Sequence, residues 1–480
     1  MSQVSRGFIW SGVERFSIQG ISFLLSILIA RIVSPSSYGL IVMVQVFLSF
    51  SQLFIDGGFA NALIQKKDRQ NIDYYTVFIF NLLVAIIIYA FLFVAAPFIA
   101  VFYNEPQITI LTRVISLNLI LSSLSIVQRA RLTIELDFKT QTKAGVLAVV
   151  ISGIAGVICA YSGLEVWALV VQSLLSQAVI SFSLIYYSKW MPKLMFSTAS
   201  FRSMFNYGSK ILMSNVLTGL YVNLSNLLIG KYYTPAKLAF YNRGFTLSQF
   251  PSVNVASVLH RVIFPTLSKL QDDRKQLIDA YQRYLHLSHY IILPLLCLLI
   301  VLATPLIEIV LTPKWLPAVP YLRIFSVNFM FYAWCMEANA PIAAIGKSGV
   351  LLKYSIVKRI IAFVILVITL GISVEAICWG ITLSSFFELV ISIYVNHKVL
   401  GTSIKTQLKY QADVFLIVAM MGILTYCFSL LFTLPLLRLI LGGVFGIALY
   451  LSLTFIFNIY EKTYLLVFLK RIVPIKKQGK

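Results

Sequence analysis

Residues 30–40, ARIVSPSSYGL, close the first apolar hairpin of the chain, and residues 230–240, GKYYTPAKLAF, repeat this stretch in altered form. Both copies read small residue, cation, two residues, hydroxyl-bearing residue and proline. The two prolines, Pro35 and Pro235, are 200 residues apart. Self-similarity at a fixed distance is the signature of a duplicated architecture. The stretch therefore predicts two related halves.

Further matches follow in the same order along the chain. Residues 96–99 (APFI) and 113–118 (RVISLN) correspond to residues 304–307 (TPLI) and 323–328 (RIFSVN), and residues 163–167 (GLEVW) correspond more weakly to residues 373–379 (SVEAICW). The distance between matched residues changes little, since Arg113 and Arg323 are 210 residues apart. Matches in order at a nearly constant distance indicate a repeat unit of about six spans, as in many transporters.

The composition predicts that lipid surrounds most of the chain. Hydrophobic residues make up 59% of the 480 residues and charged residues only 12%, which is more apolar than an ordinary soluble domain. The net charge of +22 would suggest nucleic-acid binding in a soluble protein. Here the cations lie between apolar runs, where they set topology and meet anionic headgroups. We expect contacts with membrane lipids and none with nucleic acid.

Fourteen apolar runs are long enough to cross a bilayer, which takes roughly 20 helical residues. They are residues 8–30, 40–64, 76–101, 108–128, 144–162, 165–187, 208–229, 243–265, 286–311, 319–343, 352–372, 376–396, 412–432 and 435–458. The gaps between them alternate between basic and weakly basic, as the positive-inside rule requires. The sequence predicts an all-α integral membrane protein with both termini in the cytoplasm.

Six spans per repeat is an even number, so both repeats should enter the membrane from the same side. This predicts two pseudo-symmetric six-helix bundles, residues 1–200 and 201–405, around a central cleft. Residues 406–480 should add two peripheral helices and a basic cytoplasmic tail.

Several ionisable residues lie within apolar runs, where each costs roughly 2.5–3.5 kcal/mol unless it has a partner or a water-filled cavity. They are Glu14, Arg15, Asp56, Glu337, Lys358, Arg359 and Glu388. Counting residues from the hairpin turns places Arg15 level with Asp56, and Arg359 level with Glu337 and Glu388. These groups are either charge-compensated packing contacts or the lining of a cleft for an anionic substrate or a coupling cation.

Two pairs of cations recur at matched positions near the external ends of spans. Arg31 corresponds to Lys231, and Arg113 corresponds to Arg323. Snorkelling of the charged groups to the interface would explain each position by itself. Their recurrence leaves substrate binding open as the alternative.

Residues for other chemistry are sparse. The five cysteines lie in apolar runs without paired spacing, and no GxxxxGK[ST] motif for nucleotide binding occurs. The predicted loops are too short to hold a catalytic domain. His286 and His289 are three residues apart without carboxylates at ligand spacing, so we expect a structural role for them. The sequence predicts neither enzyme activity, nor a cofactor, nor a metal site.

Three motifs are similar to those of a known family. They are residues 30–35 (ARIVSP) with Tyr38-Gly39-Leu40, residues 56–68 (DGGFANALIQKKD) and residues 165–169 (EVWAL). The chain resembles the polysaccharide transporter branch of the multidrug, oligosaccharidyl-lipid and polysaccharide exporter superfamily, in particular the colanic-acid-type lipid-linked oligosaccharide flippases. The resemblance implies a two-bundle fold and alternating access. It also implies export of a repeat-unit glycan on undecaprenyl pyrophosphate across a bacterial inner membrane, for surface polysaccharide synthesis.

The resemblance also implies roles for the charged residues. Cations of such flippases bind the pyrophosphate, a role that we carry over to Arg15 and Arg359. The further candidates for substrate binding are Lys358, Arg31, Arg113 and Arg323, and those for ion coupling or charge pairing are Glu14, Asp56, Glu337 and Glu388. The coupling ion would be Na⁺ or H⁺, and a partnership with the polysaccharide polymerase machinery stays open.

Two other functions remain as alternatives to the flippase. One is an ion-coupled multidrug antiporter of the same superfamily, which would use unpaired acidic residues in the first bundle to bind cationic drugs. The other is a membrane component of polysaccharide assembly that transports nothing.

Overall fold

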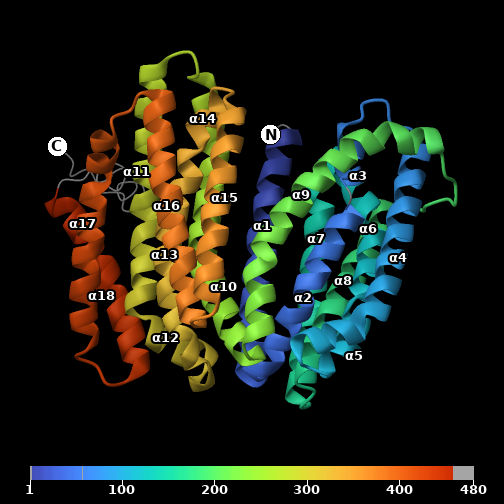
Figure 1. The fold of residues 1–480 in the computed structure, drawn as a ribbon, viewed down its shortest axis with the longest axis horizontal. Helices are drawn as coiled ribbons and strands as arrows, with labels where there is room; N and C mark the ends of the chain where they lie inside the picture. Colours follow the sequence, from blue (N-terminus) through green and yellow to red (C-terminus); the bar gives the residue numbers. More distant parts are fainter. Residues whose placement is uncertain (1–2, 57, 458–480) are drawn as a thin grey trace, which may run out of the picture. The chain divides into compact units, whose positions relative to one another are not determined.

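The computed structural model describes residues 3–56 and 58–457, without the side chains of residues 3–17, 214, 217, 218, 220–222, 262, 348 and 410. All regular secondary structure in these described residues is helical. The chain divides into two compact units, Met1–Ala239 and Phe240–Lys480. Figure 1 shows the helices of each unit.

The first unit holds nine helices in the described residues. They are α1 (Gln3–Ile32), α2 (Pro35–Asp56), α3 (Phe59–Gln65), α4 (Asn71–Tyr103), α5 (Gln107–Ile115), α6 (Leu117–Ile134), α7 (Phe138–Tyr161), α8 (Val166–Ser188) and α9 (Thr198–Tyr232). Helix α7 packs against α1 and α8, α6 packs against α4 and α8, and α9 packs against α2 and α4. Small residues allow the closest of these approaches. A Cβ on Gly153 of α7 would lie 2.1 Å from Leu25 Cδ1 of α1. The side chain of Leu25 therefore packs directly on the backbone of α7.

The second unit contains the remaining helices, of which α10 begins just before its boundary. They are α10 (Pro235–Lys269), α11 (Arg274–Val301), α12 (Ala303–Leu311), the 3₁₀-helix η1 (Pro313–Ala318), α13 (Val319–Ala338), α14 (Ala340–Ala344), α15 (Ser348–Leu370), α16 (Val374–Leu400), α17 (Ile404–Ser429) and α18 (Pro435–Ile456). Helix α13 packs against α11 and α16, while α15 packs mainly against α16. The last two helices pack against each other, and α17 also packs along α11.

The predicted all-α membrane architecture is confirmed. All fourteen predicted spans fall on helices, but residues 40–64, 108–128, 286–311 and 319–343 are each divided between two helices. Within the described residues, nine helical segments are long and apolar enough to cross a membrane. The total of fourteen spans stays a prediction. The division of the chain at residues 200 and 405 also stays a prediction, since packing alone groups α9 with the first unit.

A buried carboxylate attaches the segment before α9 to the start of α4. Asp73, only 1% exposed, accepts hydrogen bonds from Lys66 Nζ at 2.7 Å, from the Gln70 backbone N–H at 2.9 Å and from Ser200 Oγ. Nearby, the Ser197 backbone N–H donates to Thr76 Oγ1 at 3.1 Å. These contacts hold the connection between α8 and α9 against the first unit.

Candidate functional site

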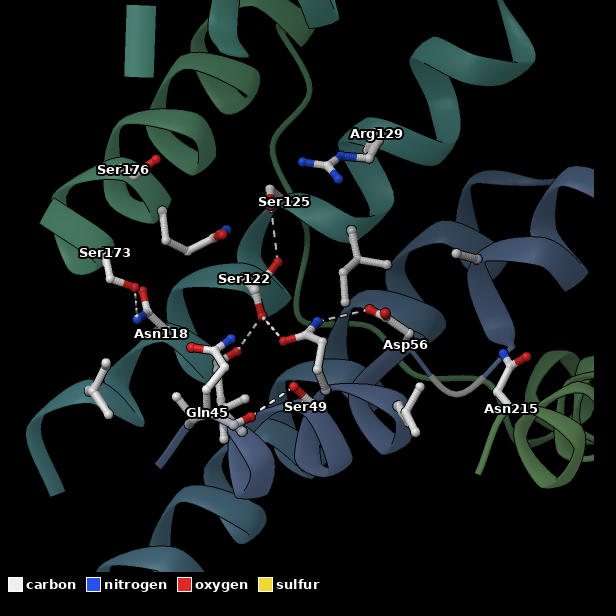
Figure 2. A pocket seen from close by; sticks show the side chains of 18 of the residues that line it. Gln45, Ser49, Asp56, Asn118, Ser122, Ser125, Arg129, Ser173, Ser176 and Asn215 are labelled. Carbon is white, nitrogen blue, oxygen red and sulfur yellow. Dashed lines mark hydrogen bonds between the residues drawn. The ribbon is translucent and has the colours of Figure 1, made fainter. Parts of the chain in front are cut away.

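A polar cavity of about 1070 Å³ lies inside the first unit, lined chiefly by α2, α6 and α8. Figure 2 shows its serine, asparagine and glutamine side chains turned toward a shared space. These helices are otherwise apolar, and lipid offers no partners to polar side chains. Polar residues are therefore kept on the inner faces, where they line a space that water or a ligand can fill. We call this cavity the chamber.

Two helices contribute polar stripes with identical spacing. The stripes are Gln45, Ser49, Gln52 and Asp56 on α2, and Asn118, Ser122, Ser125 and Arg129 on α6. Within each stripe, successive residues are 4, 3 and 4 positions apart, so each set occupies one face of its helix. The apolar residues between them remain free to pack. The sequence thus produces two matching polar faces at the chamber.

Hydrogen bonds join the stripes to each other and to α8. Ser122 Oγ donates to Gln52 Oε1 at 3.1 Å, and Gln52 Nε2 donates to Asp56 Oδ1 at 2.9 Å. Asn118 Nδ2 donates to Ser173 Oγ of α8 at 2.9 Å. Figure 2 shows this network across the chamber. The side chains are therefore held in place before any ligand binds.

Two charges of opposite sign lie at the end of the stripes. The carboxylate of Asp56 interacts electrostatically with the guanidinium of Arg129, and both side chains are exposed to the open space. The sequence predicts Arg15 as the partner of Asp56. The side chains of Arg15 and Glu14 lie outside the described part of the chain, and the cation that the structure places near Asp56 is Arg129.

Residues 28–320 match the family described as polysaccharide biosynthesis protein. The chain belongs to this family.

Curated relatives of this polysaccharide biosynthesis protein span most of its length. It is 24% identical over 438 residues to the teichuronic acid biosynthesis protein TuaB of Bacillus subtilis, with 89% of each chain covered. It is also 24% identical over 403 residues to the lipopolysaccharide biosynthesis protein WzxC of Escherichia coli, covering 82% of this chain and 81% of the relative.

Solved structures share the fold of this family member. The lipid II flippase MurJ in an inward closed conformation matches with a TM-score of 0.76 at 15% identity, covering 94% of this chain and 98% of that one. An inward-facing multidrug resistance transporter of the MATE family and MOP superfamily matches with a TM-score of 0.63 at 15% identity, covering 83% and 99%. These likenesses show that the fold is that of the predicted superfamily.

Of the eight stripe residues, the sequence analysis names only Asp56, so it missed Arg129 and the six neutral side chains. Our sequence analysis places Arg129 in a basic gap, because it follows the last apolar residues of its run. A usable signal was present, since Arg129 completes the same 4, 3, 4 spacing that Asp56 completes on α2. Searching the apolar runs for polar residues at helical spacing would have found both stripes.

The recurring arginines of this family member make matching contacts with backbone. Arg113 Nε donates to Phe93 O at 3.2 Å, with its guanidinium 4.4 Å from the Phe93 ring centroid. Arg323 Nε donates to Ile300 O at 3.2 Å, and its Nη2 donates to Thr304 Oγ1 at 3.3 Å. The shared sequence therefore encodes a shared structural contact, which accounts for its recurrence without a substrate.

The other recurring pair lies at helix ends. Lys231 Nζ donates to Phe102 O at 2.5 Å and lies 4.7 Å from the Phe102 ring centroid. Arg31 is exposed in the last turn of α1. Neither residue lines the chamber.

Of the two carboxylates that the sequence places level with Arg359, the structure shows Glu388 interacting with it. Glu388 of α16 does interact electrostatically with Arg359 and with Lys358, both on α15. Lys358 is the buried one of the two cations, and its Nζ donates to Ser392 Oγ at 2.7 Å. Glu337 has other partners. Hairpin counting finds the depth of a residue but not the direction in which its helix turns it.

Glu337 lies in a buried polar cluster between α11, α13 and α17. Its Oε1 accepts a hydrogen bond from Ser288 Oγ, and its Oε2 lies 3.9 Å from His289 Nε2. His289 Nδ1 lies 2.8 Å from Gln411 Oε1, and His286 Nε2 lies 3.1 Å from Asp413 Oδ1. Both histidines thus link α11 to its neighbours, as the predicted structural role requires.

Proposed function

We propose that this protein moves a lipid-linked oligosaccharide across the membrane by alternating access, for the synthesis of a surface polysaccharide. The observation that carries the proposal is the chamber, a large hydrogen-bonding space inside a bundle of apolar helices. A lipid-linked glycan needs such a space during its passage. Its tail can stay in lipid, but its polar head loses its water, and this is costly unless protein groups supply hydrogen bonds in place of the water.

The size and chemistry of the chamber support this cargo. Pockets for drug-sized ligands measure about 300–1,000 Å³, and the chamber, at about 1070 Å³, is at the upper end of this range. The names of the relatives point the same way, since TuaB is named a teichuronic acid biosynthesis protein, WzxC a lipopolysaccharide biosynthesis protein and MurJ a lipid II flippase. The protein acts as a transporter in this proposal, and not as an enzyme.

The finer parts of the proposal concern the carrier, the compartment and the driving force. We propose undecaprenyl pyrophosphate as the lipid carrier, the bacterial inner membrane as the location, and the cytoplasm as the site of both termini. Transport would be coupled to Na⁺ or H⁺, and the product would pass to polysaccharide polymerase machinery. The basic gaps and the resemblance of the motifs support these points.

A matched pair of arginines on α6 tests the proposal. Arg129 lines the chamber, whereas the guanidinium of Arg131 lies 5.5 Å from the Trp190 ring and 5.7 Å from the Tyr74 ring. Arg129→Ala should lower the rate at which purified protein in vesicles moves a fluorescent undecaprenyl-pyrophosphate oligosaccharide. A loss of about tenfold corresponds to about 1.4 kcal/mol of lost interaction. Arg131→Ala, reconstituted at the same level, should retain transport.

Two outcomes would contradict the proposal. Equal losses in both variants would show that α6 needs its cations only for structure. No transport of the lipid-linked glycan by the wild type, combined with sensitivity of a deletion strain to cationic drugs, would favour the antiporter. The positive charge of Arg129 acts on Asp56 electrostatically, which disfavours a cationic drug beside this carboxylate and so argues against the antiporter.

A further inference from the structure

We infer that residues 189–197 (KWMPKLMFS), which connect α8 to α9, bind anionic phospholipids of the surrounding bilayer together with the first two turns of α9. This partner is separate from the cargo of the proposed function. The inference rests on exposed apolar side chains that are held at the surface, on the cations beside them, and on a cavity whose lining combines both kinds of residue.

The connection between α8 and α9 exposes several large apolar side chains. They are Met191, Leu194, Met195 and Phe196. Leu194 is 89% exposed, and a group of exposed apolar residues flanked by polar ones marks a surface that a membrane or another protein covers. Tyr186, in the last turn of α8, is 77% exposed as well, and tyrosines gather where a membrane meets water. These features place the connection at the interface of lipid and water.

Contacts with α4 hold the connection at both of its ends. At the first end, the buried Trp190 stacks on Tyr75, with the ring centroids 5.6 Å apart. At the other end, the Ser197 backbone N–H donates to Thr76 Oγ1. Figure 1 shows the connection at the outer edge of the first unit, beside α4. The apolar side chains between these two contacts are therefore held at the surface of the protein.

The charge of this part of the chain selects an anionic lipid. Residues 186–210 contain four cations and no aspartate or glutamate. The cations are Lys189, Lys193, Arg202 and Lys210, and all four are exposed. Cations next to an apolar surface attract anionic headgroups, whereas a zwitterionic headgroup carries no net charge and gains less. The apolar side chains therefore bring the segment to the bilayer, and the cations choose the lipid.

A cavity of about 500 Å³ lies along the first two turns of α9. It is lined by Thr198, Ala199, Phe201, Arg202 and Phe205. Residues three and four positions apart lie on one face of a helix, so the phenyl rings and the guanidinium share this face. The rings offer contact to an acyl chain, and a guanidinium forms paired hydrogen bonds with a phosphate. The lining thus matches both parts of an anionic phospholipid.

A fluorescent probe on the connection tests this inference on the full-length protein. Leu194→Cys, in a Cys427→Ser background that removes the exposed native thiol, would carry an environment-sensitive nitrobenzoxadiazole dye in vesicles of phosphatidylcholine and phosphatidylglycerol. Its emission should lie to the blue of the same dye on Asp68→Cys, an exposed position between α3 and α4. Spin-labelled phosphatidylglycerol should quench the dye on Leu194→Cys several-fold more than an equal fraction of spin-labelled phosphatidylcholine.

Two double variants of equal charge separate this site from general attraction to a basic surface. Lys193→Gln with Arg202→Gln should make the two lipids quench equally, while the emission stays blue because the apolar side chains still meet lipid. Lys139→Gln with Lys143→Gln, which removes two exposed cations of α7, should retain the preference.

Three outcomes would overturn the inference. They are an emission equal to that of the dye on Asp68→Cys, equal quenching by the two lipids without the charge variants, and equal loss of the preference in both double variants. The assay measures no transport, so its result is independent of the proposed function.

Discussion

Arg113 donates a hydrogen bond to the carbonyl of Phe93, and Phe93 lies four residues before Pro97 within α4. Proline has no backbone N–H, so the carbonyl four residues earlier loses its helical donor. Such a carbonyl is costly in lipid, where no water replaces the lost bond. Arg113 supplies the missing donor. Arg323 also donates to a backbone carbonyl, that of Ile300, but this carbonyl lies in the last turn of α11 and not four residues before a proline.

We predict that the need for Arg113 depends on Pro97. Arg113→Met should destabilise the protein by about 1–3 kcal/mol, the usual cost of a buried polar group left without a partner. In a Pro97→Ala background the loss should nearly vanish, because the new backbone N–H can bond to Phe93 O. Thermal unfolding in detergent would measure this double-mutant cycle.

The repeat supplies a control for that cycle. Arg323→Met should also be destabilising, but Pro97→Ala should not relieve its effect, because Arg323 contacts a different helix. Equal losses from Arg113→Met with and without Pro97 would show that the arginine stabilises α4 in another way.

The buried lysine of α15 should matter more than its neighbour. Lys358→Met would remove the buried donor to Ser392 Oγ and the cation that acts on the half-buried Glu388, and a buried polar group left without its partner costs about 1–3 kcal/mol. We expect reduced membrane levels of this variant, and recovery when Glu388→Gln removes the negative charge. Arg359→Met should have a smaller effect, because Arg359 is exposed. Immunoblotting of membranes would compare the variants, and a larger loss from Arg359→Met would contradict this order.

Replacing Glu337 should separate the effect of its charge from that of its hydrogen bond. Glu337→Gln keeps an acceptor for Ser288, and its amide can donate to His289 Nε2, which lacks a hydrogen-bond partner. Its thermal stability should match that of the wild type. Glu337→Ala leaves Ser288 Oγ without its acceptor and should cost about 1–3 kcal/mol. A large loss from Glu337→Gln would show that the site requires the negative charge.

The connection before α9 should detach when Asp73 is removed. Asp73→Ala removes the acceptor for Lys66 and Ser200, and hydrogen bonds to charged groups contribute about 1.5–3 kcal/mol each. Trypsin should then cleave faster after Lys189 and Lys193, which precede α9. Limited proteolysis in detergent would measure the cleavage rate. The control is Asp137→Ala, which removes the side chain that caps α7 and should leave the cleavage rate unchanged.

Much of the chamber could have been predicted, whereas the polar cluster around Glu337 in the second unit could not. The stripes of α2 and α6 are visible in the sequence, because each is a helical pattern within one apolar run. The partners of Glu337 are not visible, because Ser288, His289 and Gln411 come from helices whose rotation no local pattern specifies. Counting from a hairpin turn placed Glu337 level with Arg359, yet α15 packs mainly against α16.

The sequence by itself determined where the helices lie along the chain, the duplication of its segments and the lipid environment of most of the chain. These properties depend on the hydrophobicity of consecutive residues and on matched segments, so they can be found without knowing any contact. Helix ends were less certain, and α9 begins at Thr198 instead of residue 208, because helices continue into the polar interface beyond their apolar runs. Only the tertiary structure decided which faces meet. It placed Arg129 near Asp56 and turned Glu337 toward His289, because the rotation of each helix follows from side-chain packing against distant parts of the chain.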